Sequence, residues 1–289
     1  MQFIKKIIKK IFVDTIGYEF FEKKIFLEGS KFAFLQSKKI QKVKNLSELE
    51  FSVFSQWGDD GIINWLTDKI PIKNRIFVEI GTEDYKESNT RFLLKYKNWK
   101  GYLIESNDLQ VKNINKQSIV WKHDLEVLNI KVQKKNINKI FNNLSLPKKI
   151  GLLSLDIDSN DYWIWSEIDT IKPTIFVCEF NSTFGDKKAI SVPYDEDFER
   201  KKLHYSNLAF GASLEAFKFI CKKKNYTFIG TNSSGVNAYF VDNHYIKFIK
   251  KKIKKFESFP SKIRESRDKN LKKSFVGRNN RFNKIKGIK

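Results

Sequence analysis

The sequence predicts an α/β protein whose doubly wound, mostly parallel sheet ends in an antiparallel hairpin. Apolar runs alternate with helix-like segments between residues 75 and 180. The runs are continuous, which is typical of parallel strands that are buried on both faces. Beyond them, a helix-like segment precedes two apolar runs that only a short Ser/Gly turn at 233–235 separates, and strands joined this closely pair in antiparallel fashion.

Each element follows from a local pattern along the chain. SQWGDDGIINWLTDKI at 55–70 is typical of a loop that leads into a helix. We expect strands over 75–80, 101–105, 118–122, 150–157, 173–180 and 236–241, one further strand just before the turn at 233–235, and helices over 87–97, 107–116, 134–143, 162–168 and 211–224. This order of elements predicts a Rossmann-like methyltransferase fold.

Basic extensions flank this predicted domain. FIKKIIKKIF at 3–12 repeats two apolar residues and two lysines, which is the pattern of a basic amphipathic helix. Such a helix packs on its own domain or lies on a membrane surface. We expect a basic helical N-terminal extension over 1–50, the Rossmann-like methyltransferase domain over 51–245, and a basic, partly packed C-terminal tail over 246–289.

The formal net charge of +22 lies in the two ends of the chain. Residues 1–45 contain 11 Lys against 4 acidic residues, and residues 246–289 contain 17 Lys and Arg against 3. Residues 46–245 are neutral, with 27 basic and 26 acidic residues. The neutral middle disfavours nucleic acid as a partner, whereas the basic ends suit peripheral contact with an anionic membrane. The alternative is a Lys-rich composition with solvated lysine faces.

The cellular setting follows from what the sequence lacks. No apolar run approaches the roughly 18 residues of a membrane span. The two cysteines, Cys178 and Cys221, have neither the spacing of a zinc site nor that of a disulfide framework. We therefore expect a cytoplasmic protein that contacts a membrane at most peripherally.

Acidic residues and a glycine follow the predicted strands. Glu79 and Gly81 end the first strand, and Glu105, Asp124 and Asp156 end the next three. In open α/β sheets a ligand binds outside the carboxyl ends of the strands, and an acid about 20 residues past the first turn accepts hydrogen bonds from ribose hydroxyls. We expect these five residues to bind a nucleoside-type cofactor. A helix cap or a solvated loop is the simpler reading of any one of these acids taken alone.

The first turn departs from a glycine-rich phosphate cradle. Glu83 and Tyr85 stand where an E-x-G-x-G-x-G turn would have glycine. Without that cradle, and with Glu83 and Asp84 present, a pyrophosphate is disfavoured, and with it NAD. S-adenosylmethionine has a ribose, an adenine and a cationic sulfonium but no phosphate, and is compatible with an acidic turn.

A second group of polar residues follows the fourth and fifth strands. Asp156 and Asp158 share one face of their strand, as do Glu179 and Asn181 on the next. Their convergence would hold Mg²⁺ through Asp156, Asp158 and Glu179, or would supply a base, Asp158 or Glu179, that takes a proton from a hydroxyl. Alternatively, Asp156 orients the cofactor while Asp158 and Asp161 cap the following helix.

The segment 181–213 is too long for an ordinary connection and is predicted to be a substrate lid. It contains His204 and Tyr205. Because imidazole titrates near neutral pH, His204 is a third candidate base, although a single histidine is more often structural.

The motifs together resemble the bacterial FkbM-like family of S-adenosylmethionine-dependent methyltransferases, which is often encoded with surface-polysaccharide enzymes. The similar stretches are SQWGDDGII at 55–63, FVEIG and ESNTRFLL within 77–94, NWKGYLIE at 98–105, LLSLDIDSNDYWIW at 152–165, EFNSTFG at 179–185, HYSNLAFGASLEAF at 204–217 and FPSKIRESRDKN at 259–270. TEDY at 82–85 departs from the Gly-rich turn that family members often have.

The resemblance implies a Rossmann-like fold and S-adenosylmethionine as cofactor, with Glu79, Gly81, Glu105 and Asp156 at its site. It also implies O-methylation of a sugar or glycolipid precursor in polysaccharide biosynthesis. Two alternatives remain open: a non-catalytic module that binds cofactor or glycan, and a basic RNA-binding methyltransferase. The oligomeric state is not predicted.

Overall fold

In the computed structural model of the chain, the described residues are 18–277 and 285. The helices and strands, in chain order, are α2 (Tyr18–Lys39), η2 (Leu46–Leu49), α3 (Asp59–Lys69), β1 (Ile76–Ile80), α4 (Arg91–Lys97), β2 (Lys100–Glu105), α5 (Asp108–Asn115), α6 (Ile119–Lys122), β3 (Leu125–Asn129), α7 (Ile137–Asn143), β4 (Lys149–Leu155), α8 (Asp161–Glu167), β5 (Lys172–Glu179), η3 (Ser182–Phe184), α9 (Arg200–Leu203), α10 (Leu214–Lys223), β6 (Tyr226–Thr231), β7 (Asn237–Asp242), η4 (Ile246–Phe248), β8 (Glu265–Arg267) and β9 (Lys273–Phe275).

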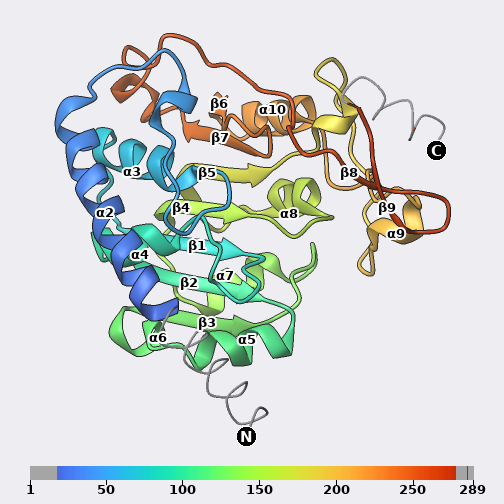
Figure 1. The fold of residues 1–289 in the computed structure, drawn as a ribbon, viewed down its shortest axis with the longest axis horizontal. Coiled ribbons are helices and arrows are strands. Elements are labelled where there is room, and N and C mark those ends of the chain that lie inside the picture. The colour runs from blue at the N-terminus through green and yellow to red at the C-terminus, as the bar shows by residue number, and fades with distance from the viewer. Residues whose placement is uncertain (1–17, 278–284, 286–289) are drawn as a thin grey trace, which may run out of the picture.

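The described strands form one seven-stranded sheet in the order β3-β2-β1-β4-β5-β7-β6 (Figure 1). β1 to β5 are parallel, while β7 pairs antiparallel with both β5 and β6. The order reverses between β1 and β4. This is the doubly wound sheet with a terminal antiparallel hairpin, so the predicted Rossmann-like methyltransferase fold is confirmed.

The register of the parallel strands aligns their carboxyl ends at one edge of the sheet. Ile80 at the end of β1 lies opposite Ile104 of β2 and Leu155 of β4. Leu155 in turn lies opposite Cys178 of β5. The residues that follow these strands therefore emerge side by side, on the side toward which the arrows of β1 and β2 point in Figure 1.

The central strands are apolar throughout because each sheet face carries its own buried cluster. Phe77 packs with Trp65 on one face, while its neighbour Val78 packs with Phe141 and Trp165 on the other. Alternate side chains of a strand point to opposite faces, so a strand covered on both sides has no polar positions. The continuous run IFVEI of β1 is the result, with Glu79 as the exception.

One predicted strand is wrong. Residues 119–122 form α6, a single helical turn, and the third strand is β3, which begins at Leu125. β3 is the edge of the sheet and is paired only with β2. Its burial is therefore partial, and its sequence LEVLN lacks the continuous apolar run of a central strand, which the apolar SIVW before it has instead.

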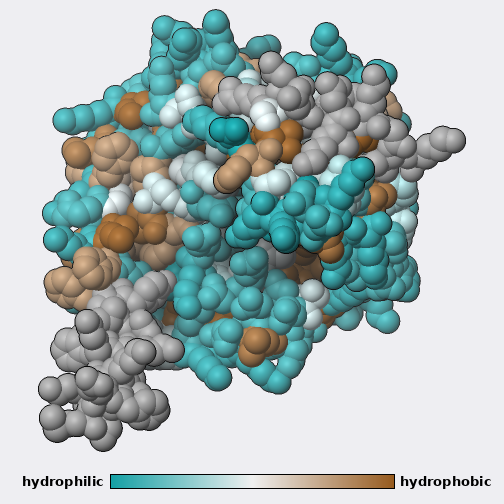
Figure 2. Space-filling view, turned by 45° about the vertical axis from the view of Figure 1, so that its right-hand side comes forward, coloured by the Kyte–Doolittle hydropathy of each residue, from teal (hydrophilic) through white to brown (hydrophobic). Residues whose placement is uncertain are grey.

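Residues before 51 and after 245 pack into one of the two buried clusters that cover the sheet. Val43 pairs with Ile253, and both lie in the same buried cluster as Trp65 and Phe77. The predicted helix at 3–12 lies outside the described residues. Within the part of the chain that the structure describes, no helix combines the length and apolarity that crossing a bilayer requires. Figure 2 shows a surface that is mostly hydrophilic, with apolar patches.

Candidate active site

A cavity of about 670 Å³ opens at the carboxyl ends of β1, β2, β4 and β5. Its walls come from the turn after β1, the residues after β2 and β3, the loop 156–160 before α8, and residues 196–200 of the predicted lid. Ile104, Ile130 and Val132 add an apolar side to it. The lid segment thus covers the edge of the sheet where the strand-end rule places a ligand.

The cavity is strongly acidic although the protein is strongly basic. Among the described residues, ten carboxylate side chains line it against two cationic ones, Lys131 and Arg200. The carboxylates are Glu79, Glu83, Glu87, Glu105, Asp156, Asp158, Glu179, Glu196, Asp197 and Glu199. A cavity with this balance favours a cationic ligand over a phosphate.

The turn after β1 has positive φ values at the two positions where a glycine-rich turn would have further glycines. Gly81, Glu83 and Tyr85 have φ values of 81°, 46° and 60°. The left-handed region costs a residue with a side chain roughly 1–2 kcal/mol. Tyr85 offsets this by complete burial, with its hydroxyl 3.1 Å from Thr90 Oγ1. The two non-glycine residues therefore replace glycine in conformation.

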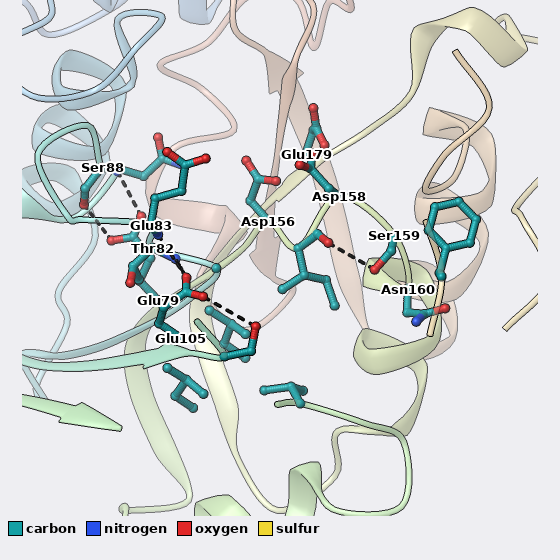
Figure 3. A pocket seen from close by; sticks show the side chains of 18 of the residues that line it. Glu79, Thr82, Glu83, Ser88, Glu105, Asp156, Asp158, Ser159, Asn160 and Glu179 are labelled. Carbon is teal, nitrogen blue, oxygen red and sulfur yellow. Dashed lines mark hydrogen bonds between the residues drawn. The ribbon is translucent and has the colours of Figure 1, made fainter. Parts of the chain in front are cut away.

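Glu105 holds this turn from the end of β2. Its Oε2 accepts hydrogen bonds from the backbone N–H groups of Thr82, at 3.1 Å, and Glu83, at 3.0 Å. Its Oε1 accepts one from Asn107 N at 2.8 Å. The carboxylate therefore fills the N–H cradle that a phosphate would use in a glycine-rich turn. It still lines the cavity (Figure 3).

Gly81 and Glu79 hold the turn after β1 in its conformation. A Cβ atom at position 81 would lie 1.6 Å from the carbonyl oxygen of Asp156, so the turn can pass the β4 loop only as glycine. Glu79 accepts hydrogen bonds from Ser88 Oγ, at 2.6 Å, Asn89 N, at 3.0 Å, and Thr90 Oγ1. Because residues 88–90 are bound to Glu79, α4 begins at Arg91 rather than at 87 as predicted.

Three of the predicted carboxylates converge. Asp156, Asp158 and Glu179 each offer an oxygen within 4.8 Å of the other two (Figure 3). Arg200 of α9 enters this group. Its Nη2 contacts Asp158 Oδ1 and lies 3.4 Å from Glu179 Oε2, and its guanidinium carbon lies 3.5 Å from the centre of the Phe210 ring. The lid thus supplies a cation to the carboxylates.

The environment raises the pKa of the two inner carboxyls. Burial, and then the neighbouring Asp161 charge, raise the pKa of Asp156 to about 7, against an opposing effect of Arg200. Burial and then the Asp156 charge raise the pKa of Glu179 well above its usual range. Burial in turn lowers the pKa of Arg200 to about 10. Because Asp156 and Glu179 lie close together and the charge of Asp156 raises the pKa of Glu179, the two carboxyls resist ionising at the same time.

The carboxylate geometry is compatible with a divalent cation, since hard cations take carboxylate oxygens. Arg200, however, contacts two of the three carboxylates. A metal ion would have to displace this guanidinium, so the group fits Mg²⁺ only without the Arg200 contacts.

Asn181 does not join the carboxylates. Its amide nitrogen donates to the carbonyl oxygens of Leu208 and Phe210, and its Oδ1 accepts from Thr183 N. Asp161 is the acid that holds the loop before α8, because it accepts from the N–H groups of Ile157 and Ser159. Asp158 does not cap this helix but pairs with Arg200.

Two predicted site residues lie elsewhere. Asp124 precedes β3 instead of following it, so it lies at the opposite edge of the sheet, exposed and 3.5 Å from Lys100 Nζ. This correction follows from the wrong third strand. His204 does not line this cavity, and its Nδ1 lies 2.7 Å from Ser206 Oγ.

A second cavity, of about 300 Å³, adjoins the first. Glu179, Arg200, Val236 and Ile263 line both. Its other walls come from residues 180–183, from Gly235, and from residues within 206–210 and 261–267, so the C-terminal segment folds back over the predicted lid. Ser261 N donates to Ser182 Oγ at 3.1 Å, and Arg267 N to Ser206 O at 3.2 Å.

Three buried polar atoms on the wall of the larger cavity have no hydrogen-bond partner among the described residues. They are Trp57 Nε1, Thr82 Oγ1 and Asn237 Oδ1. Buried polar atoms are almost always paired, so unpaired ones beside a cavity indicate a ligand or water.

Sequence reasoning missed Arg200, Trp57 and Asn237. Arg200 lies in the acidic stretch YDEDFER of the predicted lid. A single arginine beside four acidic residues is the sequence feature that could have marked it as a site residue. Trp57 belongs to SQWGDDG, whose Asp60 accepts hydrogen bonds from the N–H groups of residues 53, 54 and 55. No local pattern marks Asn237.

The chain matches no protein-family model and no curated protein. Solved structures with a similar arrangement include an S-adenosylmethionine-dependent methyltransferase from Clostridium acetobutylicum (12% identity, 73% of this chain, 98% of that chain, TM-score 0.40). Another is the N-terminal domain of EvdMO1 with SAH bound (9% identity, 74% of this chain, 94% of that chain, TM-score 0.40). A third is a methyltransferase from Aquifex aeolicus (11% identity, 71% of this chain, 97% of that chain, TM-score 0.35). Likeness at this level bears on neither substrate nor residue roles.

Proposed function

We propose that the protein is an S-adenosylmethionine-dependent O-methyltransferase, with the methyl donor in the larger cavity and the acceptor in the smaller one. The observation that carries this proposal is the acidic cavity at the carboxyl ends of the parallel strands. A donor with a ribose, an ammonium group and a sulfonium offers hydroxyls and positive charge to such walls and brings no phosphate.

The residues present fit this donor. The cavity volume of about 670 Å³ is within the usual range of small-molecule sites, about 300–1,000 Å³. Glu105 would hold the ribose hydroxyls, because its Oε1 accepts only one close backbone hydrogen bond. Asp156 would attract the cationic end, and the apolar side formed by Ile104, Ile130 and Val132 would take the adenine. Thr82 Oγ1 and Asn237 Oδ1 offer unpaired polar atoms.

The donor supplies an activated methyl group, so the protein's contribution is alignment and proton removal. Glu179 stands in the wall between the two cavities. It lies beside Asp156, and burial raises the pKa of both carboxyls, which makes an ionised member of this pair a stronger base toward an acceptor hydroxyl. Arg200 lowers the pKa of Asp156 and so favours its ionised form.

The acceptor proposal rests on the second cavity. Ser182, Thr183 and Ser206 bring hydroxyl groups and Phe210 brings an aromatic ring, a combination that suits a sugar ring. We therefore retain a sugar or glycolipid precursor as acceptor, in line with the resemblance to the FkbM-like family.

Calorimetry with S-adenosylmethionine, S-adenosylhomocysteine and NAD tests the donor site. We expect the first two to bind and NAD not to bind. Glu105→Ala should lose at least about 1 kcal/mol of binding free energy, the low end for a charged hydrogen bond. Asp124→Ala is the matched control, since Asp124 lies at the other edge of the sheet. Equal losses in the two variants, or tight NAD binding, would contradict the proposal.

A further inference from the structure

The outward face of α2 exposes an unusual share of large apolar side chains. Among the described residues, seven of the thirteen exposed large apolar side chains lie on this one helix. They are Phe20, Phe21, Ile25, Leu27, Phe32, Phe34 and Leu35. Figure 2 shows apolar surface along its left edge, on the side where α2 runs in Figure 1. Exposed apolar surface of this extent marks an interaction site.

The other face of α2 is anchored, so the helix cannot turn its apolar face inward. Phe26 and Ala33 pack with Phe54 and Phe92. Gln36 donates to the carbonyl oxygen of Leu49 at 2.7 Å and accepts from Asn64. Glu22 pairs with Lys95 and Arg91. The outward residues are therefore exposed as a consequence of how the helix is docked.

Lysines and apolar residues form parallel rows on the outward face. Phe20, Leu27 and Phe34 are spaced by seven residues, which is about two helical turns, and so lie in one line along the helix. Lys24, Lys31 and Lys38 repeat the same spacing four residues later, and all three are exposed. Lys38 Nζ lies 4.2 Å from the centre of the Phe34 ring, so the two rows are in contact.

We propose that this face of α2 binds the protein to an anionic lipid surface. Aromatic and leucine side chains enter the region between headgroups and acyl chains, while adjacent lysines reach the phosphates. A second copy of the chain is disfavoured as the occupant, because its lysine row would oppose the first in a protein of net charge +22. This proposal does not depend on the methyltransferase reaction.

Sedimentation of the full chain with phosphatidylcholine vesicles, with and without phosphatidylglycerol, tests the proposal. We expect binding only to the anionic vesicles, weakened by salt. Phe20→Glu/Leu27→Glu/Phe34→Glu should abolish it, and Lys24→Gln/Lys31→Gln/Lys38→Gln should lower the partition coefficient about 5-fold per lysine. The matched control is Phe219→Glu/Leu271→Glu/Phe275→Glu, three other exposed apolar side chains, and should bind as the unmodified protein does.

The unfolding temperature verifies that each variant is folded. Vesicle binding that survives both α2 variants would overturn the proposal and assign the contact to another segment, such as residues 1–12. Absence of vesicle binding by the unmodified protein would also overturn it. If instead the molar mass of the protein rises with concentration, and only Phe20→Glu/Leu27→Glu/Phe34→Glu prevents this rise, the occupant is a second copy of the chain.

Discussion

Arg200 Nη2 lies 3.4 Å from Glu179 Oε2, and this contact joins the lid to the last parallel strand of the sheet. The same nitrogen contacts Asp158. One lid residue thus neutralises carboxylates of both β5 and the loop before α8, so the position of the lid and the ionisation of the site are connected.

Substitution of Arg200 should change the pH dependence of ligand binding. Arg200 lowers the pKa of Asp156, which is otherwise raised by burial and by the charges of Asp161 and Glu79. Affinity for cationic S-adenosylmethionine should therefore rise as pH increases through about 7, and in Arg200→Gln this rise should move to higher pH. Calorimetry across pH measures the midpoint. Lys202 is an exposed neighbour paired with Glu199, and Lys202→Gln should leave this midpoint unchanged. If both variants shift the midpoint equally, the cause is the change in net charge alone.

Chelator should leave methyl transfer intact, because Arg200 already supplies positive charge to the carboxylates. Glu179→Gln should lower turnover of an identified acceptor about 10²- to 10⁴-fold, the usual contribution of proton transfer. Asp158→Asn should cost less, since Asp158 is exposed and does not line the second cavity. Loss of activity with chelator and its return with Mg²⁺ would favour the metal interpretation.

Thr82→Val should have opposite effects on stability and on binding. The buried hydroxyl of Thr82 has no partner among the described residues, so its removal should leave the free protein equally or more stable. If the hydroxyl binds the donor, affinity should fall by about 0.5–1.5 kcal/mol. Thermal unfolding and calorimetry on the same preparation separate the two. Unchanged affinity would place the donor away from this turn.

Gly81→Ala should destabilise the protein far more than Gly211→Ala. Both residues have positive φ, 81° and 56°, and an alanine at either site incurs the left-handed cost of about 1 kcal/mol. Only at position 81 does the new methyl group meet backbone, 1.6 Å from Asp156 O, whereas position 211 has open space. Denaturant unfolding gives the difference, and similar losses would show that the turn and the β4 loop are less closely packed.

Tyr85→Gly should lose roughly 3–5 kcal/mol of stability, the range for deleting a buried aromatic ring, although it relieves a left-handed residue. Glu83→Gly should change stability by less than about 1 kcal/mol, because relief of strain and the added entropy of the unfolded chain nearly cancel. Denaturant unfolding measures both. A stabilised Tyr85→Gly variant would mean that the ring contributes little to the turn.

Local pattern alone predicted most of the fold. Continuous apolar runs identified β1, β2, β4 and β5, because a strand covered on both faces has no polar positions. The pattern misplaced the third strand, where the edge strand beginning at Leu125 is half exposed and the apolar segment before it is a helical turn. Asp124 was misplaced with it.

The sequence by itself also determined that acids gather at one edge of the sheet. Parallel strands end at the same edge, and the sequence places Glu79, Glu105, Asp156 and Glu179 at or just after the ends of four such strands. Tertiary structure alone decided what each acid does. Glu105 binds the turn 23 residues before it in the chain, and Arg200 reaches Asp158 across 42 residues. Such pairings depend on the path of loops and on which buried charges need a partner, and neither is encoded in the spacing of neighbouring residues.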